Sequence, residues 1–467
     1  MRRRTRPPAR EEEEVIDWTA VGREVTGYLQ DLIRIDTRNP PGNESKAARY
    51  LAGVLEREGF ETAITESAPG RGNVTTRLEG GGDPPLLLLG HTDVVGVEAD
   101  QWMHPPFGGE LHDGYVWGRG ALDMKNMVVV ELMVMLLLRR HGQALNRTVL
   151  FAATADEEAG KGDHGPGWLL DHHPEQIEAP VILTEGGGAD LQVGKRRFYT
   201  CQICQKGICR MRVTARGLPG HGSVPHSENA VVRLCRAMGG LDGVALPVHQ
   251  SATLTAFLEG LAQGQPSELA RLLRQVVDPE GSEAALKALP LEEEFKASLR
   301  SLLRNTASVT MLSAGTKINV IPTEATAFVD GRLAPQQSAE SFVAELRTFI
   351  GTEVEIEVEQ YSPPLDGSST TPFYRAIEEV MEGHDPGVPV IPSLSTGGTD
   401  AKHICPRRPG TEIYGFMPYR QSPGTEEMRL IHGHDERTSV ANLLFATKVI
   451  FDLVCRYGGA PGAQPGD

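Results

Sequence analysis

The stretch Leu86-Leu-Leu-Leu-Gly-His-Thr-Asp93 decides how the first half of the chain folds. Four consecutive leucines ended by a glycine predict a buried strand of a parallel sheet. His91 and Asp93 follow directly, and both lie on one face because successive strand residues point in opposite directions. Open α/β sheets bind ligands at the carboxyl ends of their strands, and metal-bound imidazoles are commonly oriented by a carboxylate. By itself the stretch fits either a metal ligand with its orienting carboxylate or an ordinary polar strand end.

Two further apolar strands are predicted to end in acidic side chains. The segment Thr148-Val-Leu-Phe-Ala-Ala-Thr154 is followed by Asp156-Glu-Glu158. The segment Val181-Ile-Leu-Thr184 is followed by Glu185. Asp123 stands where a long irregular stretch meets an apolar helix. Three strands that alternate with helices, each ending in a possible ligand, predict a single cleft at one edge of an α/β sheet.

The composition is that of an ordinary globular protein. The 467 residues are enough for two or three domains, each with a full core. The net charge of −16 argues against nucleic acid or an anionic membrane as a partner. Six unevenly spaced cysteines predict a reduced, cytoplasmic protein rather than a disulfide framework. The first residues carry no apolar segment of a secretory signal, and 1–14 and 458–467 are predicted to be disordered tails.

A change of pattern at about Cys204 predicts a second domain inserted into the first. Residues 205–362 read as strand, helix, strand, strand, helix, strand once a helical insertion at about 252–305 is set aside. That order is the split βαβ arrangement of ferredoxin-like α+β domains. The two flanking pieces, 15–204 and 363–457, are predicted to form one α/β domain. The insertion carries no chemical motif and is expected to extend the lid or contact a dimer partner.

Six side chains from the strand ends and loops are candidate metal ligands: His91, Asp123, Glu157, Glu158, Glu185 and His432. Imidazoles with carboxylates suit zinc first, with cobalt or manganese as alternatives. Six ligands exceed what one tetrahedral zinc needs, but they would serve two ions about 3.5–4 Å apart that share a bridging carboxylate. The adjacent Glu157 and Glu158 are expected to have different roles, one binding metal and the other transferring a proton.

Taken together and in order, these motifs resemble one known family. The motifs are His91-Thr-Asp93, the aromatic block from Trp102 to Lys125, Asp156-Glu-Glu158, Thr184-Glu-Gly-Gly187, Gly220-His-Gly-Ser223 and Ile431-His-Gly-His-Asp-Glu436. The chain resembles the dinuclear zinc aminoacylase/carboxypeptidase family from about residue 17 to 455, and most of all its aminoacylase-like branch. Other members are glutamate carboxypeptidase, acetylornithine deacetylase and succinyl-diaminopimelate desuccinylase. The resemblance implies a zinc-exopeptidase-type, three-layer catalytic domain with a mixed sheet, plus an inserted ferredoxin-like lid and dimerisation domain.

The resemblance also implies a role for each candidate residue. His91 and Glu185 would bind one zinc ion, and Glu158 and His432 would bind the other. Asp123 would bridge the two ions, and its peptide bond to Met124 is expected to be cis. Asp93 would orient His91, and Glu157 would act as general base and later as general acid.

Five residues outside the metal set match motifs of the family's lid and substrate loop. His221 matches a histidine that reaches the active site of the partner subunit and polarises the scissile carbonyl. Asn319 and Arg332 match lid positions that face the substrate, and Gly398 and Thr399 match a glycine-rich loop near the substrate carboxylate. The resemblance therefore implies a homodimer that forms through the lid domain.

The implied activity is hydrolysis of the amide bond of N-acyl amino acids by a metal-bound hydroxide, with Glu157 as general base. Carboxypeptidase or dipeptidase action is the close alternative, because fold and metal ligands do not decide the substrate. A non-catalytic dimeric binding protein is the alternative from another functional class. A degenerate copy should have lost a ligand or the base, whereas this sequence retains all five ligands and Glu157.

Overall fold

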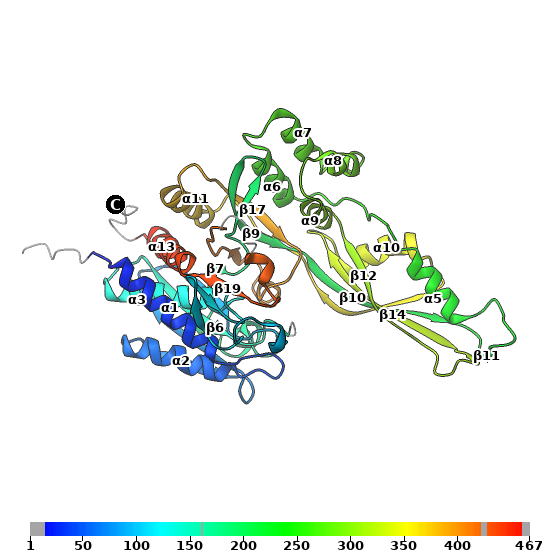
Figure 1. Cartoon of the computed structure of the whole chain (residues 1–467), viewed down its shortest axis with the longest axis horizontal. Coiled ribbons are helices and arrows are strands. Elements are labelled where there is room, and N and C mark those ends of the chain that lie inside the picture. Colours follow the sequence, from blue (N-terminus) through cyan, green and yellow to red (C-terminus); the bar gives the residue numbers. More distant parts are fainter. Residues whose placement is uncertain (1–14, 160–161, 422–426, 460–467) are drawn as a thin grey trace, which may run out of the picture.

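The computed structural model describes residues 15–159, 162–421 and 427–459. It contains one large sheet with helices on both faces and a smaller sheet to one side (Figure 1). The predicted tail 1–14 lies outside the described residues, as do residues 460–467 of the tail predicted at 458–467. In the part of the chain that is described, no helix combines the length and apolar character that crossing a bilayer requires.

The large sheet has ten strands. Its main path in space is β1 (Thr62–Glu66), β2 (Gly72–Leu78), β6 (Arg147–Thr154), β3 (Asp83–His91), β7 (Val181–Thr184), β18 (Glu412–Gly415), β9 (Arg196–Gln205) and β16 (Leu365–Asp366). Two more strands, β8 (Asp190–Val193) and β17 (Val390–Ser395), also pair with β9. The four central strands β6, β3, β7 and β18 run parallel, whereas β1, β2 and β9 add antiparallel pairs. The predicted mixed sheet is confirmed, and its parallel strands end at one common edge.

Both faces of this sheet are covered by helices, which explains why β3 is a continuous run of leucines. Leu86 and Leu88 belong to a core shared with α1 (Trp18–Arg34), α2 (Glu44–Arg57), α3 (Lys125–Arg140), α11 (Pro372–His384) and α13 (Val440–Tyr457). Leu87 and Leu89 belong to a second core with α4 (Pro166–His172) and α12 (Ala401–Ile404). A strand buried on both faces has no polar alternation. The three-layer arrangement follows directly.

Short strands organise the irregular stretch before Asp123. β4 (Glu110–His112) and β5 (Tyr115–Trp117) pair with each other, and β19 (Arg437–Ser439) pairs with β5. This third sheet, which the sequence did not predict, joins the aromatic block to the segment that carries His432. Strands of three residues are too short to show the period of two on which prediction depends.

The smaller sheet lies to the right in Figure 1 and has four strands. They are β10 (Gly207–Arg216), β12 (Thr306–Ala314), β14 (Glu324–Leu333) and β15 (Glu355–Ser362), with helices α5 (Ala230–Gly239) and α10 (Ala339–Ile350). The order β12-β14-β10-β15 with antiparallel pairing is the ferredoxin-like arrangement. A ribbon of β11 (Gly220–His221) and β13 (Val320–Ile321) extends from its far end. The domain boundaries proposed at about 205 and 362 stay predictions.

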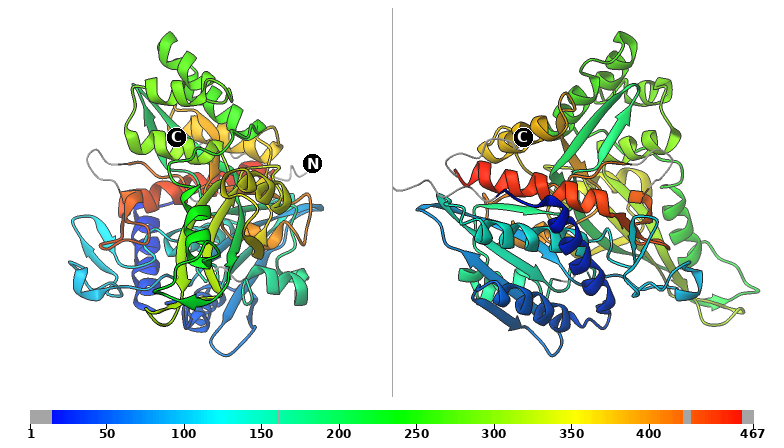
Figure 2. Two further views of the ribbon diagram at one scale, coloured as in Figure 1. Left: turned by 90° about the vertical axis from the view of Figure 1, so that its right-hand side faces the viewer. Right: turned by 60° about the vertical axis from the view of Figure 1, so that its left-hand side comes forward.

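The predicted helical insertion consists of four helices: α6 (Ala252–Ala262), α7 (Ser267–Gln275), α8 (Ser282–Ala288) and α9 (Glu293–Leu303). Their apolar side chains form one core with Val193, Phe198 and Ile391, which belong to β8, β9 and β17 of the large sheet. Figures 1 and 2 show these helices stacked above that end of the large sheet. The insertion therefore packs on the large sheet, although it is inserted in the chain between strands of the smaller one.

Candidate active site

The parallel strands bring the predicted ligands to one edge of the large sheet. His91 is the last residue of β3 and pairs in register with Thr154, the last residue of β6. Glu157 and Glu158 follow β6, and Glu185 follows β7. These side chains therefore start from neighbouring strand ends, as the sequence predicted.

Asp123 lies between two histidines and presents one oxygen to each. Its Oδ1 is 3.1 Å from Nε2 of His91, and its Oδ2 is 3.1 Å from Nε2 of His432. The same His91 nitrogen is 3.7 Å from Oε2 of Glu185, and the same His432 nitrogen is 3.1 Å from Oε2 of Glu158. Two sets of three donors result, and Asp123 belongs to both. This geometry fits two divalent cations that share one carboxylate.

The hydrogen bond of His91 identifies its tautomer. Its Nδ1 lies 3.0 Å from the backbone carbonyl oxygen of Asp93, and a carbonyl can only accept. Nδ1 therefore donates its proton, so loss of the second proton, from the Nε2 that faces Asp123 and Glu185, leaves the Nδ1–H tautomer. That is the tautomer a metal ligand requires. The Asp93 carboxylate is farther from Nδ1, at 3.5 Å, so the backbone of Asp93 orients His91 more directly than its side chain does.

The buried donors strongly shift one another's pKa values. Burial by itself lowers the pKa of His91, but the carboxylates of Glu185 and Asp123 raise it well above its ordinary value. Hydrogen bonds to Asp123 and Glu158 raise the pKa of His432 to about 10. Burial raises the pKa of Glu185 to about 7. Protons on the imidazoles thus supply the positive charge that these carboxylates require, and cations would replace those protons.

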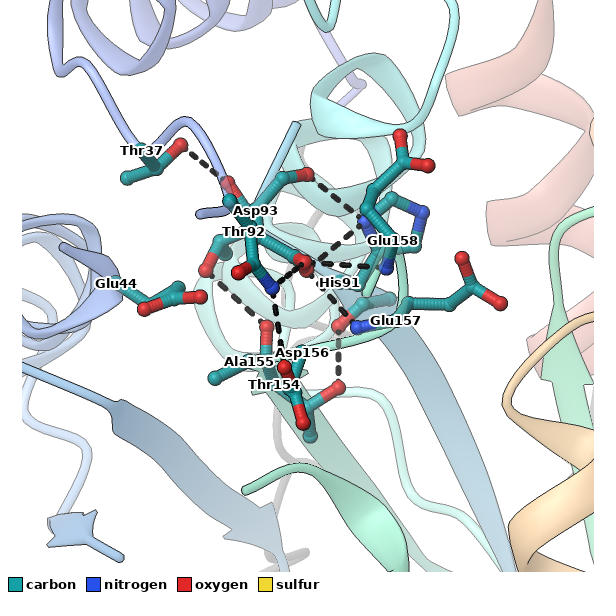
Figure 3. A network of polar contacts seen from close by, with 12 residues as sticks. Thr37, Glu44, His91, Thr92, Asp93, Thr154, Ala155, Asp156, Glu157 and Glu158 are labelled. Atoms are coloured by element: carbon teal, nitrogen blue, oxygen red, sulfur yellow. Dashed lines mark hydrogen bonds and ion pairs between the residues drawn. The ribbon is translucent and has the colours of Figure 1, made fainter. Parts of the chain in front are cut away.

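The carboxylate of Asp93 holds the loop that carries the two glutamates (Figure 3). It accepts hydrogen bonds from the backbone N–H groups of Glu157 at 3.2 Å and Glu158 at 3.1 Å. It also accepts a 2.9 Å hydrogen bond from the side chain of Asn39. Asp93 is fully buried, so these contacts are not shared with solvent. This carboxylate therefore positions the loop that carries Glu157 and Glu158.

Glu436, which the sequence placed in a motif without a role, holds Asp123. Its Oε1 accepts hydrogen bonds from the backbone N–H groups of Leu122 at 2.7 Å and Asp123 at 3.1 Å. Its Oε2 pairs with Arg119 at 2.5 Å, and the Glu436 side chain is fully buried. His432, four residues earlier, has a left-handed backbone with φ of 61°, which a residue with a side chain rarely adopts. The surrounding contacts thus impose the loop conformation that directs His432 at Asp123.

Lys402 is the main site residue that the sequence did not reveal. Its Nζ lies 2.7 Å from Oε1 of Glu157, and both side chains are nearly buried. Burial by itself lowers the pKa of Lys402, but the carboxylates of Glu157 and Asp400 raise it above its ordinary value. Glu157 thus pairs with a charged ammonium group and belongs to neither set of metal donors. The only available signal was the position of Lys402 just after the glycine-rich loop.

Comparisons with known proteins decide the family. The profile of "Peptidase family M20/M25/M40" matches residues 87–456, most of the chain. The chain belongs to this family. The N-fatty-acyl-amino acid synthase/hydrolase PM20D1 of Xenopus tropicalis is 29% identical over 364 residues, covering 76% of this chain and 69% of that protein. Aminoacylase-1 of Sus scrofa is 27% identical over 446 residues, covering 93% and 95%.

The fold is that of solved M20 structures. The M20 family metallo-carboxypeptidase Sso-CP2 from Sulfolobus solfataricus superposes with a TM-score of 0.68 at 17% sequence identity, covering 93% of this chain and 99% of that chain. The resemblance stated from the motifs is confirmed, and the protein is a metal-dependent hydrolase of the M20 family. The roles assigned to individual residues stay predictions.

Within this M20 chain, His221 and Asn319 lie apart from the metal donors, whereas Arg332 pairs in register with Ile208 at the end of the smaller sheet that joins β9. His221 is exposed on β11, at the end of the smaller sheet that Figure 1 shows far from β6 and β7. Its described polar contacts are local, with Ser223 at 2.7 Å. Asn319 accepts a backbone hydrogen bond from Gly222 in the same ribbon, and Arg332 pairs with Asp330 at 3.1 Å.

The two predicted loop residues do lie at the site. Thr399 donates a 3.0 Å hydrogen bond to the side chain of Gln205. A Cβ atom built on Gly398 would lie 3.2 Å from the Lys402 side chain, so the glycine allows this loop to approach Lys402 closely. The loop therefore lies beside the pair of Lys402 and Glu157.

Proposed function

We propose that this M20 hydrolase cleaves the amide bond of N-acyl amino acids with two zinc ions, for which cobalt or manganese could substitute. The first ion would be held by His91 and Glu185, the second by Glu158 and His432, with Asp123 shared. The observation that carries the proposal is the placement of each Asp123 oxygen 3.1 Å from a different imidazole. Zinc fits because the donors are nitrogen and carboxylate oxygen, without thiolate.

When bound, the ions supply the positive charge that activates water and polarises a carbonyl. The protein residues then move one proton. Glu157 accepts a proton from water and delivers it to the nitrogen of the departing amine. Lys402 holds the Glu157 carboxylate in place, and Asp93 holds the backbone of the same loop. His221 of the partner subunit would donate a hydrogen bond to the carbonyl oxygen.

The choice of N-acyl amino acids over peptides rests on the relatives. Aminoacylase-1 aligns over nearly the full length of both chains, and the PM20D1 protein is named as a hydrolase of N-fatty-acyl amino acids. Both names describe an amide between an acyl group and an amino acid. Asn319, Arg332, Gly398 and Thr399 are proposed to contact the amino-acid half.

A homodimer is part of the proposal, and an edge strand supports it. β12 is an outer strand of the smaller sheet, and it exposes large apolar side chains such as Met311 and Leu312. Ile318, in the connection from β12 to β13, is fully exposed. Exposed apolar edge strands pair readily with another chain. A second copy would cover this edge.

Mixing two inactive variants tests the shared site. Dimers of His221→Ala alone or of Glu157→Ala alone should be inactive. A heterodimer of the two contains one site with both residues intact, so mixing should restore part of the activity. The cross-subunit role is wrong if heterodimers form, as native mass spectrometry would show, and no activity returns.

We also propose that the protein is cytoplasmic. All six cysteines are free thiols in the structure, which supports a reducing compartment.

The activity itself is tested with a pooled library of N-acyl amino acids and dipeptides. The zinc-loaded protein is incubated with the pool, and mass spectrometry follows the release of free amino acids, with Glu157→Gln as the control. Release from acylated members alone supports the proposal. Cleavage of dipeptides alone assigns the protein to the peptidases of the family. No turnover by a folded, metal-loaded sample would favour the binding-protein alternative.

A further inference from the structure

The helical insertion forms one wall of a cavity whose lining reaches the residue next to the candidate metal donor Glu185. The cavity has a volume of about 590 Å³ and begins at Gly186, the residue after Glu185. Phe257 of α6 and Ala297 and Ser298 of α9 line the side opposite β9 and β17. This volume falls in the range of small-molecule sites. The insertion therefore has a position from which it can contact a substrate held at the metal centre.

None of the described residues that line this cavity carries a charge. Several of its hydroxyl groups already have partners within the chain. Ser298 donates to the backbone oxygen of Glu294 at 3.0 Å, and Ser395 accepts from the backbone N–H of Gly397 at 3.0 Å. An aliphatic group that enters the cavity would leave those hydroxyls satisfied, so it would not incur the cost of burying unpaired polar groups.

The position of Glu157 decides which half of the substrate faces this cavity. In the proposed reaction Glu157 delivers a proton to the amine, so the amino-acid half lies near Glu157, Lys402 and Thr399. None of these three residues is among those lining the cavity at Gly186. A second cavity of about 510 Å³, between β18 and β9, is lined by Thr399 and by the candidate metal donor Glu185, so it lies on the side of the amino-acid half. The acyl half therefore points toward Gly186 and the insertion.

We infer that the cavity between the insertion and β9 binds the acyl chain of the substrate, and that α6 and α9 select uncharged aliphatic chains. This inference rests on the proposed hydrolysis of N-acyl amino acids. It assigns a function to residues 252–305, and it places the acyl chain against Phe257, Ala297 and Leu302.

Blocking the cavity at its exposed wall tests the inference. Ala297 is exposed on α9, so Ala297→Phe adds bulk at the cavity without disturbing a core. Ala288→Phe is the matched control, because Ala288 is exposed on α8 of the same insertion and does not line the cavity. The assay measures kcat/KM for one amino acid carrying acyl chains from acetyl to dodecanoyl.

In the wild type, kcat/KM should rise with chain length by up to about fourfold for each buried methylene. Ala297→Phe should lower kcat/KM for the dodecanoyl substrate by at least about tenfold, a change of about 1.4 kcal/mol, and leave the acetyl substrate within about twofold. Ala288→Phe should follow the wild type. An unchanged chain-length profile in a folded Ala297→Phe protein would overturn the inference. Failure of the wild type to cleave any acylated substrate, including acetyl, would instead remove the proposed function and the inference together.

A second measurement does not depend on turnover or on the Ala297→Phe variant. Zinc-loaded Glu157→Gln protein is irradiated with dodecanoic acid that carries a terminal photoreactive diazirine, and the labelled peptides are identified by mass spectrometry. Labels on α6 or α9 support the inference. Labels on residues 405–406 or 409–413, which line the cavity between β18 and β9, would place the chain there and overturn it.

Discussion

Replacement of Asp93 by asparagine should weaken both metal positions at once. The Asp93 carboxylate accepts hydrogen bonds from Asn39 and from the backbone of Glu157 and Glu158, and it lies 3.5 Å from Nδ1 of His91. In either orientation, the asparagine amide would present its NH₂ group to two of these donors. Asp93→Asn therefore removes about two accepted hydrogen bonds and places donor against donor.

The size of the effect follows from the burial of these contacts. A hydrogen bond to a charged group contributes about 1.5–3 kcal/mol, so two lost bonds cost about 3–6 kcal/mol before the loop relaxes. Loss of an outer-shell partner usually costs about 10–100-fold in metal affinity. Because Asp93 supports both His91 and the backbone of Glu158, both ions should bind at least about tenfold more weakly.

Competition between the metal-free protein and a fluorescent zinc chelator measures the two affinities. Thr92→Val is the control, because the Thr92 hydroxyl donates to the backbone of Thr154 on the opposite side of the strand. That variant should lose some stability and keep both zinc affinities. Wild-type affinity for both ions in Asp93→Asn would refute the reasoning. Weakening of one ion alone would show that Asp93 acts only through His91.

Four further outcomes follow from the structure. Glu157→Gln should bind both ions and lose about 10²–10⁴-fold in kcat, since general acid–base catalysis contributes about that factor, as elemental analysis and steady-state kinetics would show. Lys402→Met alone should lower the free energy of unfolding by about 3 kcal/mol, because it leaves the buried Glu157 carboxylate without its partner. In a protein that already carries Glu157→Gln, the same change should cost much less. Urea titrations of the wild type, the two single variants and the double variant measure this coupling. Burial raises the pKa of Glu131 well above its ordinary value, so the folded state loses stability relative to the unfolded state as pH rises above about 4.5. In urea titrations the free energy of unfolding of the wild type should fall, relative to Glu131→Gln, by up to about 1.4 kcal/mol per pH unit. The absence of such a slope would show that Glu131 has a charged partner. Removal of metal by a chelator should abolish activity. Rebinding of metal at pH 7.5 should release protons from His91 and His432, because their raised pKa values keep both protonated without metal. Calorimetry in buffers of different ionisation enthalpy counts the released protons, and the His432→Ala variant should release about one proton fewer.

The sequence was most informative where a local pattern has one physical outcome. Four leucines in β3 predicted a strand covered on both faces, and the two cores that share Leu86–Leu89 have that form. Residues after parallel strands must meet at one edge of the sheet, so the sequence alone groups His91, Glu158 and Glu185. Their grouping needed only strand direction and chain order.

Other features of the site depend on contacts that have no local pattern. Lys402 and Glu157 are separated by 245 residues, and nothing around either residue indicates an ion pair. Glu436 holds the backbone of Leu122 and Asp123 across more than 300 residues. The strands β4, β5 and β19, which make this contact possible, are too short to be recognised by period.

The sequence by itself determined the family, the order of the main elements and the set of candidate metal donors, because these depend on residue type and on spacing along the chain. Only the tertiary structure decided which oxygen of Asp123 faces which histidine, which nitrogen of His91 faces the carboxylates and which cation pairs with Glu157. It also decided that the insertion packs on the large sheet rather than the smaller one. Packing between distant segments places these groups. The partner of a buried charge or an apolar face therefore depends on the tertiary structure and not on the local sequence.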